Sequence, residues 1–115
     1  MSVPAAFTPC GKTVKIQAAT SYPAAVQVSS TTLGGNQYRI INSSGTQGAF
    51  LSWGETATIA QTNCVIPTGG GANASAVLYL LPNTDEILTF QPNAYFTAIT
   101  AANTADLYIV PGDGL

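Results

Sequence analysis

Residues 86–112 read EILTFQPNAYFTAITAANTADLYIVPG, and this stretch decides the fold. It contains three runs rich in apolar side chains, at 86–90, 95–100 and 105–110. Ile, Leu, Val, Thr, Tyr and Phe predominate in these runs, which is typical of short β-strands bounded by turn residues. Proline, asparagine and glycine separate the runs, and the last run is expected to end at Pro111-Gly112. The stretch therefore predicts three short strands joined by turns.

The same pattern extends toward the N-terminus. Further strands are expected at 14–18, 24–30, 37–42, 49–54, 63–66 and 76–81. Residues 55–60 fit either a helical turn or a continued loop, and no stretch holds an apolar stripe of helical period over three turns. Eight or nine short strands, with a turn signal roughly every 8 to 12 residues, predict an all-β fold. We expect one antiparallel, jelly-roll-like β-sandwich domain over residues 1–115.

The two ends of the chain depart from this pattern. Residues 1–12 hold two prolines and a glycine, which predicts an irregular N-terminal arm, and residues 111–115 form a C-terminal tail. Either end could add a strand to the sheet edge of a neighbouring subunit, and the alternative is that both are frayed. The candidate interface residues are therefore Val3, Pro4, Phe7, Pro9, Pro111 and Leu115.

Charge is scarce in this chain. It has no His, three Lys or Arg and five Asp or Glu, so the net charge is −2. The charged fraction is 7%, against roughly 25% in an average soluble protein. Three cations cannot neutralise a run of phosphates, so nucleic-acid binding is not expected. Because so few charges give little repulsion between molecules, we expect an oligomer or a larger assembly. The alternative is a monomer kept soluble by neutral amides and hydroxyls.

The expected cellular compartment is inferred from the lack of a membrane span and of a secretory signal. No run approaches the roughly 18 apolar residues of a membrane span, and the first residues do not resemble a secretory signal. We therefore expect no membrane association and no export. Cys10 and Cys64 belong to no CxxC or Cys/His cluster, so no metal site is expected. They are either two reduced thiols in a cytoplasmic product or one disulfide that pins the arm.

No constellation of residues predicts catalysis. Ser52 has no His to act as its base, and it lacks the first glycine of a G-x-S-x-G elbow. Asp85 and Glu86 are adjacent, so in a strand they point to opposite faces. The glycines at 69–71 lack the lysine and the spacing of a phosphate-binding loop. We expect no enzyme, no catalytic residue and no cofactor.

The aromatic residues have two interpretations. They are Phe50, Trp53, Tyr79, Phe90, Tyr95, Phe96 and Tyr108. An exposed row of rings could stack on a carbohydrate. Because these rings fall in runs of period two and no polar cluster accompanies them, core or interface positions are favoured.

Several stretches resemble small virion proteins of tailed bacteriophages. They are YRIIN at 38–42 with AFLSWG at 49–54, LTFQPNAYF at 88–96, and FTAIT at 96–100 followed by LYIVPGDGL at 107–115. The resemblance runs over roughly residues 14–115. It is closest in kind to capsid decoration, or cement, proteins, which are small β-sandwiches that form trimers or dimers over the joints between major capsid subunits. The resemblance implies no catalytic residues.

Composition and resemblance lead to the same functional expectation. The chain is expected to be a non-enzymatic virion protein that binds the outer capsid surface and stabilises contacts between major capsid subunits. Its partners would be the major capsid protein and further copies of itself, after synthesis in the host cytoplasm. A head–tail connector, or a tail or fibre component, is the first alternative. A carbohydrate-binding β-sandwich module is the second.

Overall fold

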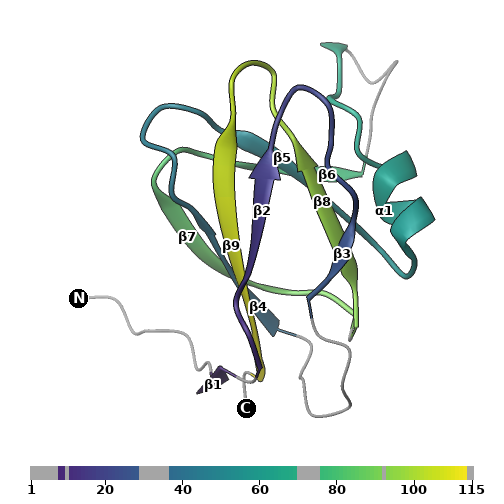
Figure 1. The fold of residues 1–115 in the computed structure, drawn as a ribbon, viewed down its shortest axis with the longest axis vertical. Helices are drawn as coiled ribbons and strands as arrows, with labels where there is room; N and C mark the ends of the chain where they lie inside the picture. Colours follow the sequence, from purple (N-terminus) through teal and green to yellow (C-terminus); the bar gives the residue numbers. More distant parts are fainter. Residues whose placement is uncertain (1–7, 10, 29–36, 70–75, 92, 114–115) are drawn as a thin grey trace.

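The protein is an antiparallel β-sandwich with one short helix on its outside (Figure 1). The computed structural model describes residues 8–9, 11–28, 37–69, 76–91 and 93–113. Its elements are β1 (Thr8–Pro9), β2 (Val14–Ala18), β3 (Val26–Gln27), β4 (Gln37–Asn42), β5 (Ala49–Gly54), α1 (Ala57–Thr62), β6 (Val77–Leu80), β7 (Thr84–Thr89), β8 (Tyr95–Ile99) and β9 (Ala105–Asp113). The predicted all-β sandwich is confirmed.

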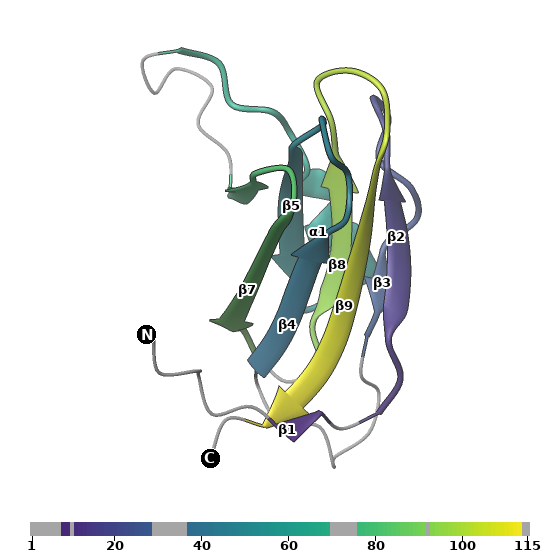
Figure 2. The ribbon, with the colours of Figure 1, turned by 90° about the vertical axis from the view of Figure 1, so that its left-hand side faces the viewer.

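The strands pair as one long hairpin that has been folded over. β5 pairs with β6, β4 with β7, β3 with β8 and β2 with β9, all antiparallel. Folding this hairpin over makes two sheets. Sheet A has the order β2-β9-β4-β7, with β1 also beside β9, and sheet B has the order β3-β8-β5-β6. Two four-stranded sheets with this nested pairing are the arrangement of a jelly roll. Figure 2 shows the two layers from the side.

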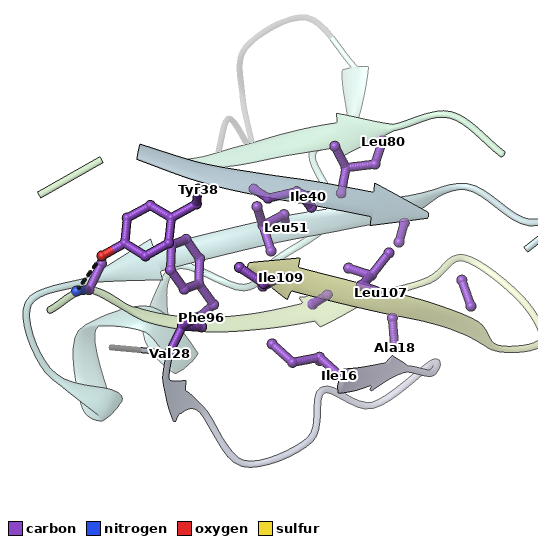
Figure 3. Close-up of a cluster of buried hydrophobic side chains, with 14 residues drawn as sticks. Ile16, Ala18, Val28, Tyr38, Ile40, Leu51, Leu80, Phe96, Leu107 and Ile109 are labelled. Carbon is purple, nitrogen blue, oxygen red and sulfur yellow. Dashed lines mark hydrogen bonds between the residues drawn. The ribbon is translucent and has the colours of Figure 1, made fainter. Parts of the chain in front are cut away.

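The core lies between the sheets and follows the alternation of the strands. Tyr38 and Ile40 of β4 point toward Leu51 of β5 and Phe96 of β8, and all four are buried (Figure 3). The Tyr38 hydroxyl donates to the Gln91 carbonyl at 3.1 Å and accepts from a backbone N–H, so its polar end is satisfied. Desolvation by burial raises the pKa of Tyr38.

Helix α1 settles the ambiguity of residues 55–60. The Thr56 side chain accepts from the Ile59 N–H at 3.2 Å, which is the contact of an N-cap. The strand expected at 63–66 is wrong. Asn63 and Cys64 donate their backbone N–H groups to the carbonyls of Ile59 and Gln61. These bonds close the end of the helix, so the two N–H groups cannot join a sheet ladder.

Both ends of the chain are more regular than expected. Thr8 and Pro9 pair with Asp113 and Gly112, so part of the arm is a strand. The final strand does not end at Pro111 but continues to Asp113. Pro111 is tolerated inside it because the neighbouring ladder is interrupted there, between Pro9 and Val14. The strand expected at 24–30 is reduced to β3, and its last two residues lie outside the described part.

Candidate interaction surface

The part of the chain that the structure describes contains neither a cluster of metal-ligating side chains nor a helix that could span a membrane. No three His, Cys, Asp or Glu side chains gather in the described ranges, and no described helix is long and apolar enough to cross a bilayer. Ser52 is buried, and its hydroxyl donates to the Ala60 carbonyl at 2.7 Å. Its role is to hold α1 on sheet B, because its proton is already committed to that bond.

The outer face of sheet A carries charge. Arg39 of β4 forms a forked ion pair with Asp85 of β7, including a bond from Nε to Oδ1 at 2.9 Å. The Lys15 ammonium of β2 lies 3.6 Å from the carboxylate of Asp106 in β9. Each pair joins diagonal neighbours across one strand interface, β4 to β7 and β2 to β9, on the same face of the sheet. Four of the eight charged residues of the chain are therefore used on this face.

The ion pair between Arg39 and Asp85 shifts the pKa values of both side chains. Hydrogen bonding and attraction from Arg39 lower the pKa of the Asp85 carboxyl, against a smaller opposing effect of desolvation. The same contacts raise the pKa of Arg39. Both side chains remain about half exposed, with side-chain exposures of 47% for Arg39 and 43% for Asp85. The pair therefore orders the surface of sheet A more than it stabilises the fold.

The outer face of sheet B is different, because none of its four strands contains a charged residue. At its centre Phe50 of β5 pairs in register with Tyr79 of β6 on one side and Ile99 of β8 on the other. The rings of Phe50 and Tyr79 lie 4.7 Å apart between centroids, tilted by 44°. Tyr79 is 45% exposed. We call Phe50, Tyr79 and Ile99 the apolar row.

Helix α1 and a neighbouring segment cover the rest of this face. Besides the bond from Ser52 to the helix, Gly54 lies so close to Ile59 that an added Cβ would stand 2.6 Å from its Cγ2. Thr97 of β8 is buried, and its hydroxyl donates to the Pro23 carbonyl at 2.8 Å. Figure 1 shows α1 outside the sandwich, beside β3 and β8. The apolar row is thus the open part of a face that is otherwise covered.

Cys64 lies beneath this covering layer. It is a free, buried thiol, and desolvation by burial raises the pKa of the Cys64 thiol. A raised pKa keeps the sulfur protonated and unreactive in the folded protein. Its position beside Ser52 makes it a reporter of how tightly α1 is held.

The candidate interface residues named from the sequence fall into two groups. Pro9 is exposed in β1, whereas Pro111 is buried inside β9 and so serves the fold of this chain. The others lie outside the described residues: Val3, Pro4, Phe7 and Leu115. Pro9 and the buried Pro111 therefore both lie at one end of sheet A, where Pro9 pairs with Gly112, the residue after Pro111.

The aromatic residues are divided between core and surface. Phe96 is fully buried, and Phe90 packs against it with 5.3 Å between ring centroids. Trp53 is half-buried against Phe90 at 4.9 Å. The apolar row was not singled out by sequence reasoning. The aromatic residues of the row, Phe50 and Tyr79, stand in the predicted runs 49–54 and 76–81. Only the register between these two strands shows that their rings lie next to each other.

The chain matches no family model, no curated protein and no solved structure. The jelly roll itself occurs in viral capsid proteins, in lectins and in cupins, so the fold leaves several functions open. The choice among them depends on the surface, and its most distinctive part is the uncharged outer face of sheet B.

Proposed function

We propose that this protein is a non-enzymatic structural subunit that works by binding other protein surfaces. The observation that carries the proposal is the uncharged outer face of sheet B, with the apolar row at its centre. Cores of protein interfaces are depleted in charge and enriched in aromatic residues. A partner would remove Tyr79 and its neighbours from water at little desolvation cost, because no charge is buried with them.

The assembly that fits best is a bacteriophage capsid, with this chain as a decoration protein on the outer shell. Two considerations support this assignment: the resemblance of its sequence to small virion proteins, and a surface poor in charge. In this role the protein would add contacts across the joints between major capsid subunits, and copies of the chain would associate as trimers or dimers. A specific interface of this kind buries roughly 800 Å² per partner, so the apolar row would form one part of it, together with exposed residues around the row.

The decisive experiment is cryo-electron microscopy of particles purified from the same source as the chain. We expect density for the jelly roll at repeating positions on the capsid lattice, with sheet B toward the shell. Density at the neck in a ring would instead assign the chain as a head–tail connector, and density along the tail or fibres would assign it there. Either outcome would overturn the decoration role.

Carbohydrate binding is a second candidate, and one observation favours it. The ring of Tyr79 is 45% exposed on an open sheet face, where a sugar could stack. Against it, the neighbouring ring of Phe50 is tilted, and no charged side chain of sheet B converges on the pair. A glycan array tests this directly. Specific binding that Tyr79→Ala abolishes would replace the proposed structural role.

A further inference from the structure

Among the strands that the structure describes, β6 has the least protected outer edge. β6 pairs with β5 on one side, and no described strand pairs with its other side. Among the other outermost strands, β2 contains Lys15, β7 contains Asp85 and Glu86, and β3 is only two residues long. β6 contains neither charge nor proline. Charges and prolines are the usual means of preventing an edge from pairing, so β6 remains open to an incoming strand.

The backbone of β6 has hydrogen-bonding groups that point outward. The Thr100 N–H donates to the Ala19 carbonyl at 2.9 Å, so the backbone groups of Thr100 point away from β5 and those of Ile99 point toward it. Because Ile99 pairs with Phe50, the next residue of β5, Leu51, turns its backbone groups toward Leu78 of β6. Since backbone groups alternate in direction along a strand, those of Val77 and Tyr79 point outward. These two residues thus offer N–H donors and carbonyl acceptors, which is what strand addition requires.

A free carboxylate stands beside this edge. Glu86 of β7 pairs in register with Ile40, whose side chain is buried in the core, so Glu86 lies on the inner face of sheet A. It is nonetheless exposed, and no described residue gives it an ion pair or hydrogen bond. β6 and β7 lie on the same side of the sandwich, joined by the short corner 81–83. A strand added to β6 would therefore pass over Glu86.

The charges of the chain decide what kind of strand would fit. Two of the three cations, Lys15 and Arg39, are already paired on the outer face of sheet A, and Lys12 precedes β2. A second copy of β6 would bring its own β7, and with it a second Glu86, toward the first. Like charges placed this close disfavour such a pairing. A strand with a basic side chain on its inward face would neutralise Glu86 instead.

We propose that the outer edge of β6 accepts an extended segment of a partner protein that presents a lysine or arginine to Glu86. This inference deepens the proposed function, because it names the kind of partner segment through which a shell protein would be held. Main-chain bonds to Val77 and Tyr79 provide the pairing, and the ion pair with Glu86 provides the preference for a basic segment. A single short segment binds weakly, and repetition on a lattice would make the attachment firm.

The test uses a synthetic strand and the full-length protein. The probe is an acetylated and amidated seven-residue peptide, with lysine at its centre, valine two residues to either side, and threonine elsewhere. A matched peptide carries glutamate in place of the lysine, and a third carries N-methyl groups on the amides that would face Val77 and Tyr79. Binding is followed by the backbone amide shifts of β6 in ¹⁵N spectra. We expect the lysine peptide to move the β6 amides and the N-methylated peptide to leave them unchanged.

The variants separate the edge from the charge. Glu86→Gln is expected to weaken binding of the lysine peptide by up to about fivefold, as for an exposed ion pair. Glu55→Gln removes the same charge next to α1 and should leave binding unchanged. Equal binding of the lysine and glutamate peptides, shifts confined to β7, or no shifts at all would each overturn the inference. Particles that bind the wild type and Val77→Pro, which lacks one outward N–H, equally would overturn it too, while leaving the proposed function standing.

Discussion

The outer faces of the two sheets differ although the sheets serve the same core. Sheet A carries two ion pairs across its strands, whereas the strands of sheet B carry no charge and expose the apolar row. Both sheets bury their inner faces against each other, so folding alone does not require the difference. The comparison teaches that the paired charges of sheet A suit contact with water, whereas the proposed function would have a partner cover the face of sheet B. Each experiment below would break or sharpen this contrast.

The largest effect is expected from a charge placed on the apolar row. Tyr79→Glu would bury an unpaired carboxylate at the proposed interface, and such a change typically weakens binding by about 30-fold or more. Co-sedimentation with particles measures the loss. The matched control is Tyr108→Glu, on the outer face of sheet A, where Lys15 is the register neighbour. Equal losses for both variants would mean that the two faces are not functionally different.

The next effect concerns the layer that covers sheet B. Gly54→Ala would place a Cβ 2.6 Å from Cγ2 of Ile59 and 2.8 Å from the backbone nitrogen of Ala60, so α1 must move. Overpacking of this kind costs about 1–3 kcal/mol. Urea unfolding measures this loss, and faster alkylation of Cys64 would show that the helix has loosened.

The control for that variant is Gly45→Ala, whose added Cβ would meet nothing closer than 3.9 Å. It should leave both unfolding and alkylation nearly unchanged. If Gly54→Ala were equally neutral, α1 would not be packed as tightly on sheet B as the structure indicates.

A smaller effect distinguishes a buried hydroxyl from an exposed one. Ser52→Ala removes the donor that satisfies the buried Ala60 carbonyl, which should cost about 1 kcal/mol in the free energy of unfolding. Ser43 makes a similar contact, with its hydroxyl 3.0 Å from the Asp106 carbonyl, but at an exposed position. Ser43→Ala should cost less than half as much, because water can replace the hydroxyl. Equal costs would contradict the burial of this part of sheet B.

The smallest effect is the pH dependence of the ion pair on sheet A. Arg39 lowers the pKa of Asp85 below its ordinary value of 3.8, so the charged carboxylate is favoured in the folded state. The resulting stabilisation is fully present above the ordinary pKa and is lost as the pH falls through the lowered one. The difference in melting temperature between the wild type and Asp85→Asn should therefore shrink as the pH falls below 3.8 and disappear once the pH lies below the lowered pKa.

A variant that lacks Arg39 tests whether this residue causes the pH dependence of the Asp85 effect. In Arg39→Gln protein, Asp85→Asn should no longer change the pH profile, because the group that lowers the pKa is gone. A persistent difference in that background would assign the effect to another group near Asp85.

The strands could be predicted from the sequence because their signal is local. The boundaries of β4 and β5 match the predicted runs 37–42 and 49–54, which are bounded by turn residues in the sequence. The helix could not be predicted with the same clarity, because Ala57–Thr62 is too short to show a helical stripe and depends on the Thr56 cap and on packing against Gly54. The continuation of β9 through Pro111 depends on an interruption in a neighbouring strand, which no local pattern contains.

The candidate surface was harder to predict than the fold for a related reason. The apolar row joins Phe50, Tyr79 and Ile99 from three separate strands, and their register is set by the nested pairing of the whole chain. The scarcity of charge in the sequence already favoured a covered surface. Only the structure shows that two ion pairs lie on the outer face of sheet A and that the strands of sheet B contain no charged residue. Sequence reasoning placed the interface at the termini, where Pro111 turned out to be buried within its own chain.

The pairing of Thr8 with Asp113 also gives the molecule a mechanical direction. Tension applied between these two neighbouring residues would open the ladder one pair at a time, starting where β1 meets β9. Load delivered through the face of sheet B would instead be shared by its four strands at once. A subunit anchored by that face would therefore resist stretching of its support far better than pulling at its own ends.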